Sequence, residues 1–390
     1  MKSNSVKRRE FLKMAGIGFS AFLSGGFRAI GAEGLGRFSA IRDVGTLLPP
    51  DLNGIRLPSG FRSRVVARSG ASPIDGARAW HGAPDGGGVF AQPDGGWIYV
   101  SNSEIFGKGG AGALRFSSSG TLVDSYPILE NTSQNCAGGT TPWGTWLSCE
   151  ETRSGQVYEC DPTGANPAIP RPTLGVFSHE AVAVDETSGY LFLTEDRPDG
   201  GFYRFVPSRG LPDISRGKLE IAVVENIAGE DIVTWHEVPD PLARTMATRK
   251  QVKGYQPFRG GEGVIIHERT VFFSTKRDNR VWAYNIESHQ LSLAYDLATS
   301  ASPVLSGVDN LAITPTGDVL VAEDGGHMQL VALTSDEKVM PILQIVGHDR
   351  SEITGPAFDP SFERLYFSSQ RGSGGTNADG VTYEITYLRS

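Results

Sequence analysis

The chain has 390 residues, of which 39% are hydrophobic and 21% charged, and its formal net charge is -8 at pH 7. This length suits one large domain or two ordinary ones, and the acidic balance argues against a nucleic-acid surface, which would carry clustered basic residues. After the N-terminal region no apolar stretch reaches the ~20 residues that span a bilayer, so we expect no stable membrane insertion.

The first 32 residues are predicted to be a twin-arginine signal peptide. Arg8 and Arg9 lie within Lys7-Arg8-Arg9-Glu10-Phe11-Leu12-Lys13, and a mild apolar stretch follows over residues 14–23. Small residues near Ala32 offer a cleavage site. We therefore expect export through the twin-arginine machinery to the periplasm or beyond. The other interpretation is a basic amphipathic helix of a cytosolic protein.

The rest of the chain is predicted to be all-β, because its apolar runs are short, β-branched or aromatic, and bounded by turn-forming residues, with 49 glycines in all. Six runs form an internal repeat whose neighbours lie 45 to 48 residues apart, except across one longer gap: 97–100, 145–148, 190–193, 271–274, 319–322 and 365–368. This period predicts a six-bladed β-propeller. The competing fold is a pair of β-sandwich domains, which would lack such regular phasing.

The repeat suggests how the chain is divided. Residues 33–60 are predicted to be an N-terminal extension and residues 61–390 the propeller. Residues 61–68 are expected to close the ring against the last blade, because a propeller pairs its first and last sheets. The long gap, between the third and fourth repeat strands, is expected to hold two outer strands and an insertion at 240–256 with four basic residues.

Polar residues recur just past the six repeat strands: Asn102, Glu150, Glu195, Lys276, Glu323 and Gln370. Fourteen or fifteen residues before four of these stand Cys136, Glu180, Glu262 and Asp309, each at the start of a predicted inner strand. In a propeller the inner strands begin at one mouth of the channel, and the next strands end there. Clustered carboxylates and a thiolate would repel one another without bound cations, so the pattern predicts a metal site. The alternative is a set of solvated turn residues.

The predicted metal ligands are Cys136, Glu150, Glu180, Glu195, Glu262, Asp309 and Glu323. A mixture of soft thiolate and hard carboxylate ligands suits a transition ion beside a calcium-like ion. Glu151, Asp196 and Asp324 are weaker candidates, because alternation along a strand turns them to the opposite face.

Other motifs exclude several enzyme classes. The histidines show neither HxH nor HExxH spacing, which disfavours a zinc hydrolase, although His179 is a candidate for supporting the ligand beside it. The sequence has no Gly-x-Ser-x-Gly elbow, Walker A loop or dinucleotide fingerprint. Cys149 and Cys160 could form a disulfide if their strands are neighbours in the right register, and a free Cys136 could instead be a small buried hydrophobe.

The segments Asn135-Cys136-Ala137-Gly138-Gly139, Thr141-Pro142-Trp143-Gly144-Thr145-Trp146 leading to Cys149-Glu150-Glu151, and His179-Glu180-Ala181-Val182 resemble the PhoX-type alkaline phosphatase family. The resemblance implies a six-bladed propeller with Fe³⁺ and Ca²⁺ at the channel mouth and hydrolysis of phosphate monoesters in the periplasm. It implies that Cys136 binds iron and that Glu180 and Glu262 share this cluster. Glu150, Glu195, Asp309 and Glu323 are assigned to calcium or bridging positions. The chain is shorter than the large phosphatases, as expected of a compact member.

Two departures from the family pattern bear on the activity. Asn102-Ser103-Glu104 stands where the family has Asn-His-Glu, and Gly260 stands where large members have an arginine two positions before the glutamate of blade four. Arg259 and Arg277 are the candidates to replace it. We expect a small phosphorylated substrate to contact Asn102, Arg259, Lys276 and Arg277. The competing functions are a calcium-dependent propeller lactonase or esterase, and a non-catalytic binding propeller stabilised by metals.

Overall fold

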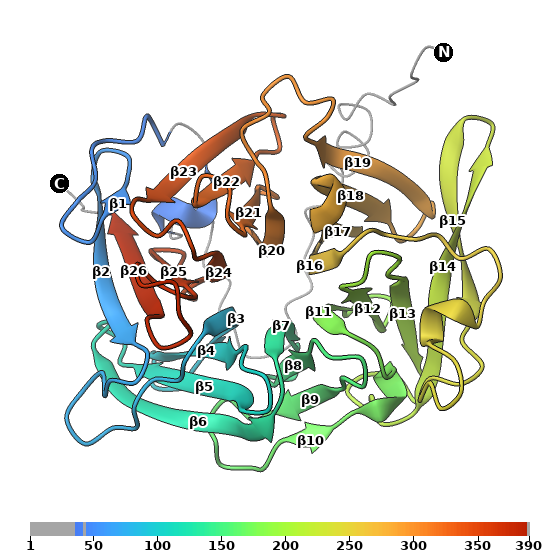
Figure 1. The fold of residues 1–390 in the computed structure, drawn as a ribbon, viewed down its shortest axis with the longest axis horizontal. Coiled ribbons are helices and arrows are strands. Elements are labelled where there is room, and N and C mark those ends of the chain that lie inside the picture. The colour runs from blue at the N-terminus through green and yellow to red at the C-terminus, as the bar shows by residue number, and fades with distance from the viewer. Residues whose placement is uncertain (1–35, 42–43, 388–390) are drawn as a thin grey trace.

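The structure, a computed structural model, describes residues 36–41 and 44–387 (Figure 1). The predicted signal peptide lies outside these residues. Regular structure in the described part consists of strands and four short 3₁₀ helices, η2 (Arg37–Ser39), η3 (Pro172–Leu174), η4 (Thr248–Lys250) and η5 (Lys276–Asp278). The all-β prediction is therefore confirmed. None of the described helices is long and apolar enough to cross a membrane.

The strands form five hydrogen-bonded sheets. The first contains β3 (Pro84–Ala91), β4 (Trp97–Ser103), β5 (Gly109–Phe116) and β6 (Leu122–Thr132). The second contains β7 (Asn135–Thr140), β8 (Trp146–Glu150), β9 (Val157–Cys160) and β10 (Ile169–Pro170).

The third sheet has nine strands. In spatial order they are β11 (His179–Asp185), β12 (Tyr190–Glu195), β13 (Phe202–Pro207), β14 (Gly217–Ile227), β15 (Glu230–Glu237), β19 (Gln290–Asp296), β18 (Arg280–Asn285), β17 (Thr270–Thr275) and β16 (Gly261–His267). The long gap of the repeat thus holds β14 and β15, which include both predicted outer strands, and η4.

The last two sheets include strands from the N-terminal region. One contains β20 (Val308–Ile313), β21 (Val319–Glu323), β22 (Gln329–Leu333), β23 (Val339–Ile345) and β1 (Ile55–Arg56). The other contains β24 (Ile353–Phe358), β25 (Arg364–Ser369), β26 (Val381–Tyr387) and β2 (Phe61–Arg68). Each of the six repeat strands is found, as the second strand of its hairpin.

The sheets are arranged around a centre like the blades of a propeller (Figure 1). The strands nearest the centre are β3, β7, β11, β16, β20 and β24, and each contacts the next around the ring. The propeller-like prediction is confirmed. The count of six blades stays a prediction, because pairing of β15 with β19 joins the strands from β11 to β19 into one sheet.

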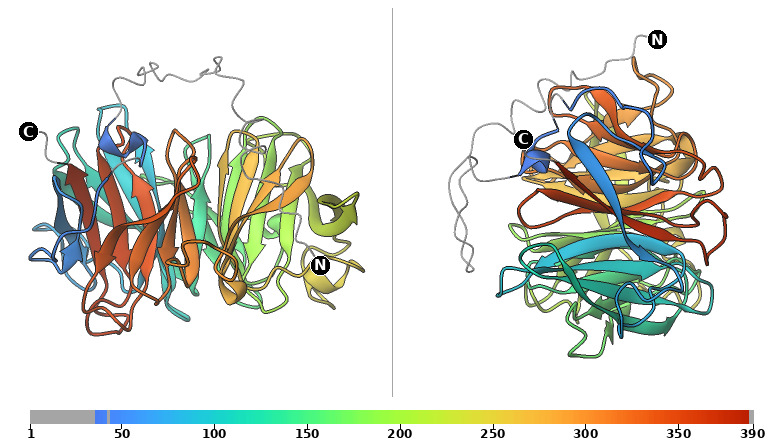
Figure 2. Two further views of the ribbon diagram at one scale, coloured as in Figure 1. Left: turned by 90° about the horizontal axis from the view of Figure 1, so that it is seen from above. Right: turned by 90° about the vertical axis from the view of Figure 1, so that its left-hand side faces the viewer.

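The N-terminal strands seal the ring on its outer side. β2 pairs antiparallel with β26 along its length, as predicted for residues 61–68, so the last sheet combines both ends of the described chain (Figure 2). β1 pairs with the edge of β23, and Phe38 and Ile41 of the predicted extension pack into the same hydrophobic core. Covering these two edges removes sites at which another chain could add a strand.

The hydrophobic core lies between neighbouring sheets. Leu330 and Ile342 pack with Phe367 and Ile385 of the next sheet, and all four side chains are buried. Near the axis the inner strands approach too closely for larger residues. A Cβ at Gly86 would lie 2.4 Å from the Cα of Ala137 on the neighbouring strand. Small residues are therefore required where the strands converge.

Candidate metal centre

A β-bulge interrupts five of the inner strands at their first residues. In β3, Pro84 pairs with Ser103 and pairing resumes only at Gly87 with Ser101, so one strand has an extra residue. The same break occurs in β7, β11, β16 and β20. The residues that follow the first pair are Asp85, Cys136, Glu180, Glu262 and Asp309. Because a bulge re-aims a side chain, these five residues can face their neighbours around the axis.

A second set comes from the residue directly after the second strand of each hairpin. In chain order these residues are Glu104, Glu151, Asp196, Lys276, Asp324 and Gln370. They occupy equivalent positions, because the last residue of the second strand pairs in every case with the first residue of the inner strand. The two sets therefore meet at one end of the channel.

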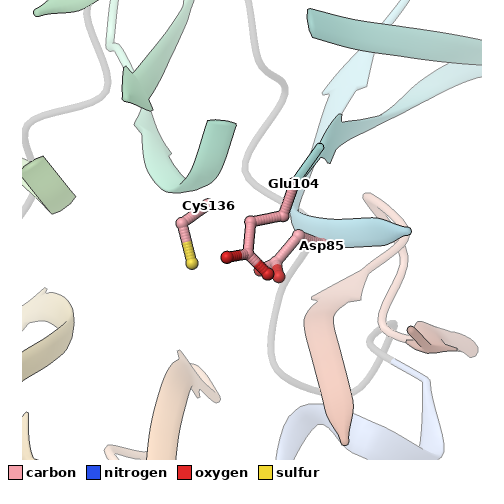
Figure 3. Close-up of side chains that lie close together, drawn as sticks. All are labelled: Asp85, Glu104 and Cys136. Carbon is pink, nitrogen blue, oxygen red and sulfur yellow. The ribbon is translucent and has the colours of Figure 1, made fainter. Parts of the chain in front are cut away.

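Eight acidic or thiol residues of these two sets, together with Glu352 just before β24, form what we call the central cluster: Asp85, Glu104, Cys136, Glu151, Glu180, Glu262, Asp309, Asp324 and Glu352. Its members fall into four overlapping groups of three, in each of which one ligand atom per residue lies within 4.8 Å of the others. Figure 3 shows the first group, in which Asp85, Glu104 and Cys136 come from different segments and place their oxygens and sulfur close together. Neighbouring groups share Cys136, Glu180 or Asp309.

Burial and mutual repulsion make the charged forms of these acids unfavourable. Burial, and then the negative charge of Glu262, raise the pKa of Glu180 well above its usual value. Burial raises the pKa of Glu151 to about 8, with the carboxylate of Asp196 adding to the effect. Burial also raises the pKa of Asp309 to about 6, although Lys276 acts in the opposite direction. Without further cations, several of these groups would hold protons at neutral pH.

Glu180 gives the clearest indication of a missing partner. Its side chain is 1% exposed, and neither carboxylate oxygen has a hydrogen-bond partner among the described residues. It belongs both to the group with Cys136 and Glu151 and to the group with Glu262 and Asp309. A buried carboxylate without partners is costly, and a bound cation would satisfy it.

Cationic side chains reach only part of the central cluster. Lys276 forms ion pairs with Glu262, Asp309 and Asp324. Arg371 pairs with Glu352 at 2.6 Å and lies 3.6 Å from Glu104. Two cations therefore face eight carboxylates and one thiol. This donor set fits metal ions, the carboxylates suiting hard cations and Cys136 a softer one.

The structure brings together five of the predicted site residues: Cys136, Glu180, Glu262, Asp309 and Lys276. It places three other predicted ligands in loop-stabilising contacts instead. Glu150 accepts hydrogen bonds from the backbone N–H groups of Ser133 and Gln156, at 2.9 and 3.2 Å.

Glu195 and Glu323 resemble Glu150 in these contacts. Glu323 accepts three backbone hydrogen bonds, from Ser306, His327 and Gln329. Glu195 accepts from the N–H of Gly201 and the hydroxyl of Tyr203, and it pairs with Arg249 at 2.7 Å. These contacts are an alternative to metal binding for all three glutamates.

The expectation that Glu151 and Asp324 face away from the site is wrong. Both residues belong to the central cluster, one position beyond the predicted Glu150 and Glu323. Alternation holds only within a strand, and β8 and β21 end at Glu150 and Glu323. Beyond the strand end this alternation no longer applies, and Asp324 forms a single β-bridge with Glu352.

Both polar atoms of the Asn102 side chain have hydrogen-bond partners inside the protein. Its amide nitrogen donates to the carbonyls of Cys136 and Ala137, and its oxygen accepts from Trp146 and Ser148. The side chain is 0% exposed. These contacts argue against phosphate binding by Asn102 and show that it holds the backbone that carries Cys136.

Arg259 and Arg277 lie together beside the central cluster. The backbone N–H of Arg277 donates to the carbonyl of Arg259 at 3.1 Å. Arg277 directly follows Lys276, and Arg259 lies three residues before Glu262. Both arginines are exposed. Neither guanidinium forms an ion pair with a described carboxylate, which leaves both able to bind an anion.

The remaining motifs have structural roles. His179 stacks on Phe177 and donates from Nε2 to the carbonyl of Gly175, and burial lowers its pKa to about 4. All three cysteines are free. Cys149 and Cys160 do not form the disulfide considered above, because Cys160 pairs with Trp146 and the two thiols enter different hydrophobic clusters.

The prediction missed Asp85, Glu104 and Glu352. Asp85 is the second residue of a glycine-rich strand whose few apolar residues give no clear strand pattern. The spacing was also different: 19 residues separate Asp85 from Glu104, and 18 separate Glu352 from Gln370, compared with 14 to 16 in the other hairpins. The adjacent Asn102-Ser103-Glu104 motif was the available signal for Glu104.

Comparisons with known proteins bear on the family. The model of the family described as alkaline phosphatase PhoX matches residues 109–163 and 152–283, which include Cys136, Glu151, Glu180 and Glu262. The resemblance to the PhoX family is confirmed. No curated protein sequence matches the chain significantly.

Solved structures agree on the fold. PhoX of Pseudomonas fluorescens, in complex with vanadate, a transition state analogue, superposes with a TM-score of 0.73 at 15% identity, over 88% of this chain and 97% of that one. A protein of unknown function from Bacteroides thetaiotaomicron gives a TM-score of 0.51 at 11% identity, over 87% and 83%. At these identities the likeness concerns the fold alone.

Proposed function

We propose that this protein is a metal-dependent hydrolase of small phosphate monoesters, similar in activity to PhoX-type alkaline phosphatases. The observation that carries the proposal is the buried, unpartnered carboxylate of Glu180, which lies between two acidic groups. The match to the PhoX family supports phosphate esters as the substrate class.

The proposal includes Ca²⁺ and Fe³⁺ as the cofactors. Cys136, with Glu151 and Glu180, would hold iron, the softer of the two ions. Carboxylates of the central cluster next to this group would hold calcium. When bound, such ions would neutralise phosphoryl charge and activate an oxygen nucleophile. Glu150, Glu195 and Glu323 are left out of this ligand set because of their loop contacts.

The chain's own residues would bind the substrate. Arg259 and Arg277 are exposed beside Glu262, and a guanidinium can bind two phosphate oxygens at once. The predicted phosphate contact of Lys276 is not retained, because three carboxylates surround its ammonium. Asn102 would act by positioning the Cys136 backbone.

We also propose that the chain is divided into a signal peptide, an extension and a six-bladed propeller. The nine-stranded sheet would count as two blades, giving six, with residues 240–256 as an insertion between them. Residues 1–32 would be the twin-arginine signal, residues 33–60 an extension and residues 61–390 the propeller. Export by this route would place the enzyme in the periplasm or outside the cell.

The test is hydrolysis by protein exported in its native form. We expect it to release phosphate from a chromogenic monoester, to lose activity on chelation, and to regain it with calcium and iron. Glu180→Gln should lower the rate by about 100-fold or more, because it removes a ligand at the centre of the cluster. Hydrolysis of lactones or carboxyl esters without phosphate release would favour a lactonase or esterase. Loss of fold on chelation without any hydrolysis would favour a binding protein.

A further inference from the structure

Lys276 is the exception among six equivalent positions. The residue directly after the second strand is acidic in four hairpins, where it is Glu104, Glu151, Asp196 or Asp324, and it is Gln370 in the last. Only at Lys276 does a positive charge enter the ring from this position. The equivalence follows from the register, because Gly261 pairs with Thr275 just as Asn135 pairs with Glu150.

The ammonium of Lys276 lies among carboxylates from three different segments. Its Nζ is 3.0 Å from Asp324, 3.3 Å from Glu262 and 3.6 Å from Asp309. The side chains of Glu262 and Asp309 are 1% and 4% exposed, so water can do little to screen their charge. Calcium would require oxygens at about 2.3–2.6 Å in the same space. The ammonium and a calcium ion therefore compete for these three carboxylates.

The part of the cluster around Cys136 has weaker compensation: Arg371 lies 3.6 Å from Glu104, and Lys276 acts on Glu151 without forming an ion pair with it. The group of Cys136, Glu151 and Glu180 has no ion pair with a lysine or arginine among the described residues. Gln370 donates hydrogen bonds to Glu104 and Asp85, but it carries no charge. Glu180 joins this group to Glu262 and Asp309, and its unpartnered oxygens point to a cation that Lys276 does not supply.

We propose that Lys276 takes the place of one metal ion, so that the protein's bound metals are confined to the side of the cluster that contains Cys136 and Glu180. This inference rests on the proposed function only in assuming that the cluster binds metals. It makes Lys276 a positioning residue, which fixes the number and place of the ions and does not itself contact substrate.

The test compares metal content in variants of the full exported chain. Lys276→Met removes the charge and keeps much of the side-chain length, and Lys276→Arg keeps the charge. Lys218→Met is the matched control, because Lys218 pairs with Glu237 on outer strands far from the cluster. Each protein is dialysed against one defined calcium concentration and analysed for elements, and its thermal unfolding is measured with and without calcium.

We expect Lys276→Met to bind about one additional calcium ion per chain and to gain more thermal stability from calcium than the wild type. Lys276→Arg and Lys218→Met should keep the wild-type count. An unchanged count in Lys276→Met, with no added calcium dependence of its melting temperature, would overturn the inference. If Lys276→Met folds only in the presence of calcium, the inference is supported.

The result of this calcium-binding test can be distinguished from the result of the phosphatase test. Additional calcium in Lys276→Met, together with a wild type that releases no phosphate, would refute the phosphatase and leave this inference standing. A metal-dependent phosphatase in which Lys276→Met binds no additional ion would refute this inference alone.

Discussion

Cys136 is the one soft ligand in the central cluster, and its role can be tested by replacing its sulfur with oxygen. Burial and the surrounding carboxylates raise the pKa of its thiol, so without a nearby cation it would remain protonated. A bound metal ion would reverse this preference, because a coordinating thiol loses its proton.

We therefore expect Cys136→Ser to lower the iron content and to abolish any visible absorption from thiolate bound to iron. Elemental analysis and an absorption spectrum measure both. Cys149→Ala is the matched control, because Cys149 is buried in a hydrophobic cluster away from the site. It should lose about 1 kcal/mol of stability and keep its metals. Equal iron in wild type and Cys136→Ser would contradict the assignment.

At the scale of single residues, sequence reasoning identified Cys136, Glu180, Glu262 and Asp309 because each begins an inner strand. It placed several residues of the returning strand one position too early. The position that faces the axis lies just beyond the strand, where the periodicity of side chains no longer applies. Only the observed strand ends separate Glu150 from Glu151.

At the scale of strands, the same adjacent pair has two distinct functions. Glu150 holds two loops through backbone hydrogen bonds, whereas Glu151 belongs to the central cluster. Glu150→Gln should therefore lower the free energy of unfolding by about 1–2 kcal/mol, because it disturbs buried backbone partners. It should leave the metal content unchanged.

Glu151→Gln is expected to behave in the opposite way, with weaker metal binding and no loss of stability in chelator. Chemical unfolding and elemental analysis of both variants distinguish the roles. If Glu150→Gln lost metal while Glu151→Gln did not, the assignment of Glu151 rather than Glu150 to the central cluster would be wrong.

The strands themselves were largely predictable, since turn-forming residues bound short apolar runs. The bulges that turn Asp85 and the four equivalent residues toward the axis were not. A bulge is set by pairing between two strands, and residues far apart in the chain decide that register. The glycine-rich sequence of β3 also hid its pattern, because its packing needs small residues close to β7.

At the scale of the whole molecule, the raised pKa values make stability depend on pH and on metals. In the unfolded chain these carboxyls would titrate near their ordinary values, about 4. In the folded protein the pKa of Asp309 is about 6 and that of Glu151 about 8. From about pH 4 up to these folded-state values, the folded protein binds more protons than the unfolded chain. The free energy of unfolding therefore falls as pH rises through this range.

We therefore expect the melting temperature of chelated protein to fall progressively from about pH 5 to pH 8. Bound metals stabilise the ionised carboxylates and should remove most of this decline. A pH series of thermal unfolding, with chelator and with calcium and iron, measures the difference. A melting temperature of the chelated protein that rises over this interval would contradict the account of the cluster.

Ring closure by β2 was predictable from the requirement that a propeller hide its edges, and the structure has this pairing. The continuous sheet through β15 and β19 was not, because the repeat only indicated that additional residues lie there. The charge pattern of the cluster depends on six separate segments meeting, which no local pattern in the sequence specifies.

The most direct test of the account is anomalous diffraction at the iron absorption edge from crystals of protein exported in its native form. We expect an iron peak within bonding distance of the Cys136 sulfur, about 2.3 Å, with carboxylate oxygens of Glu151 or Glu180 also coordinated. Absence of any anomalous peak at the central cluster, in crystals whose protein hydrolyses phosphate monoesters, would contradict the central claim that this ring of acids and one thiol is the metal centre.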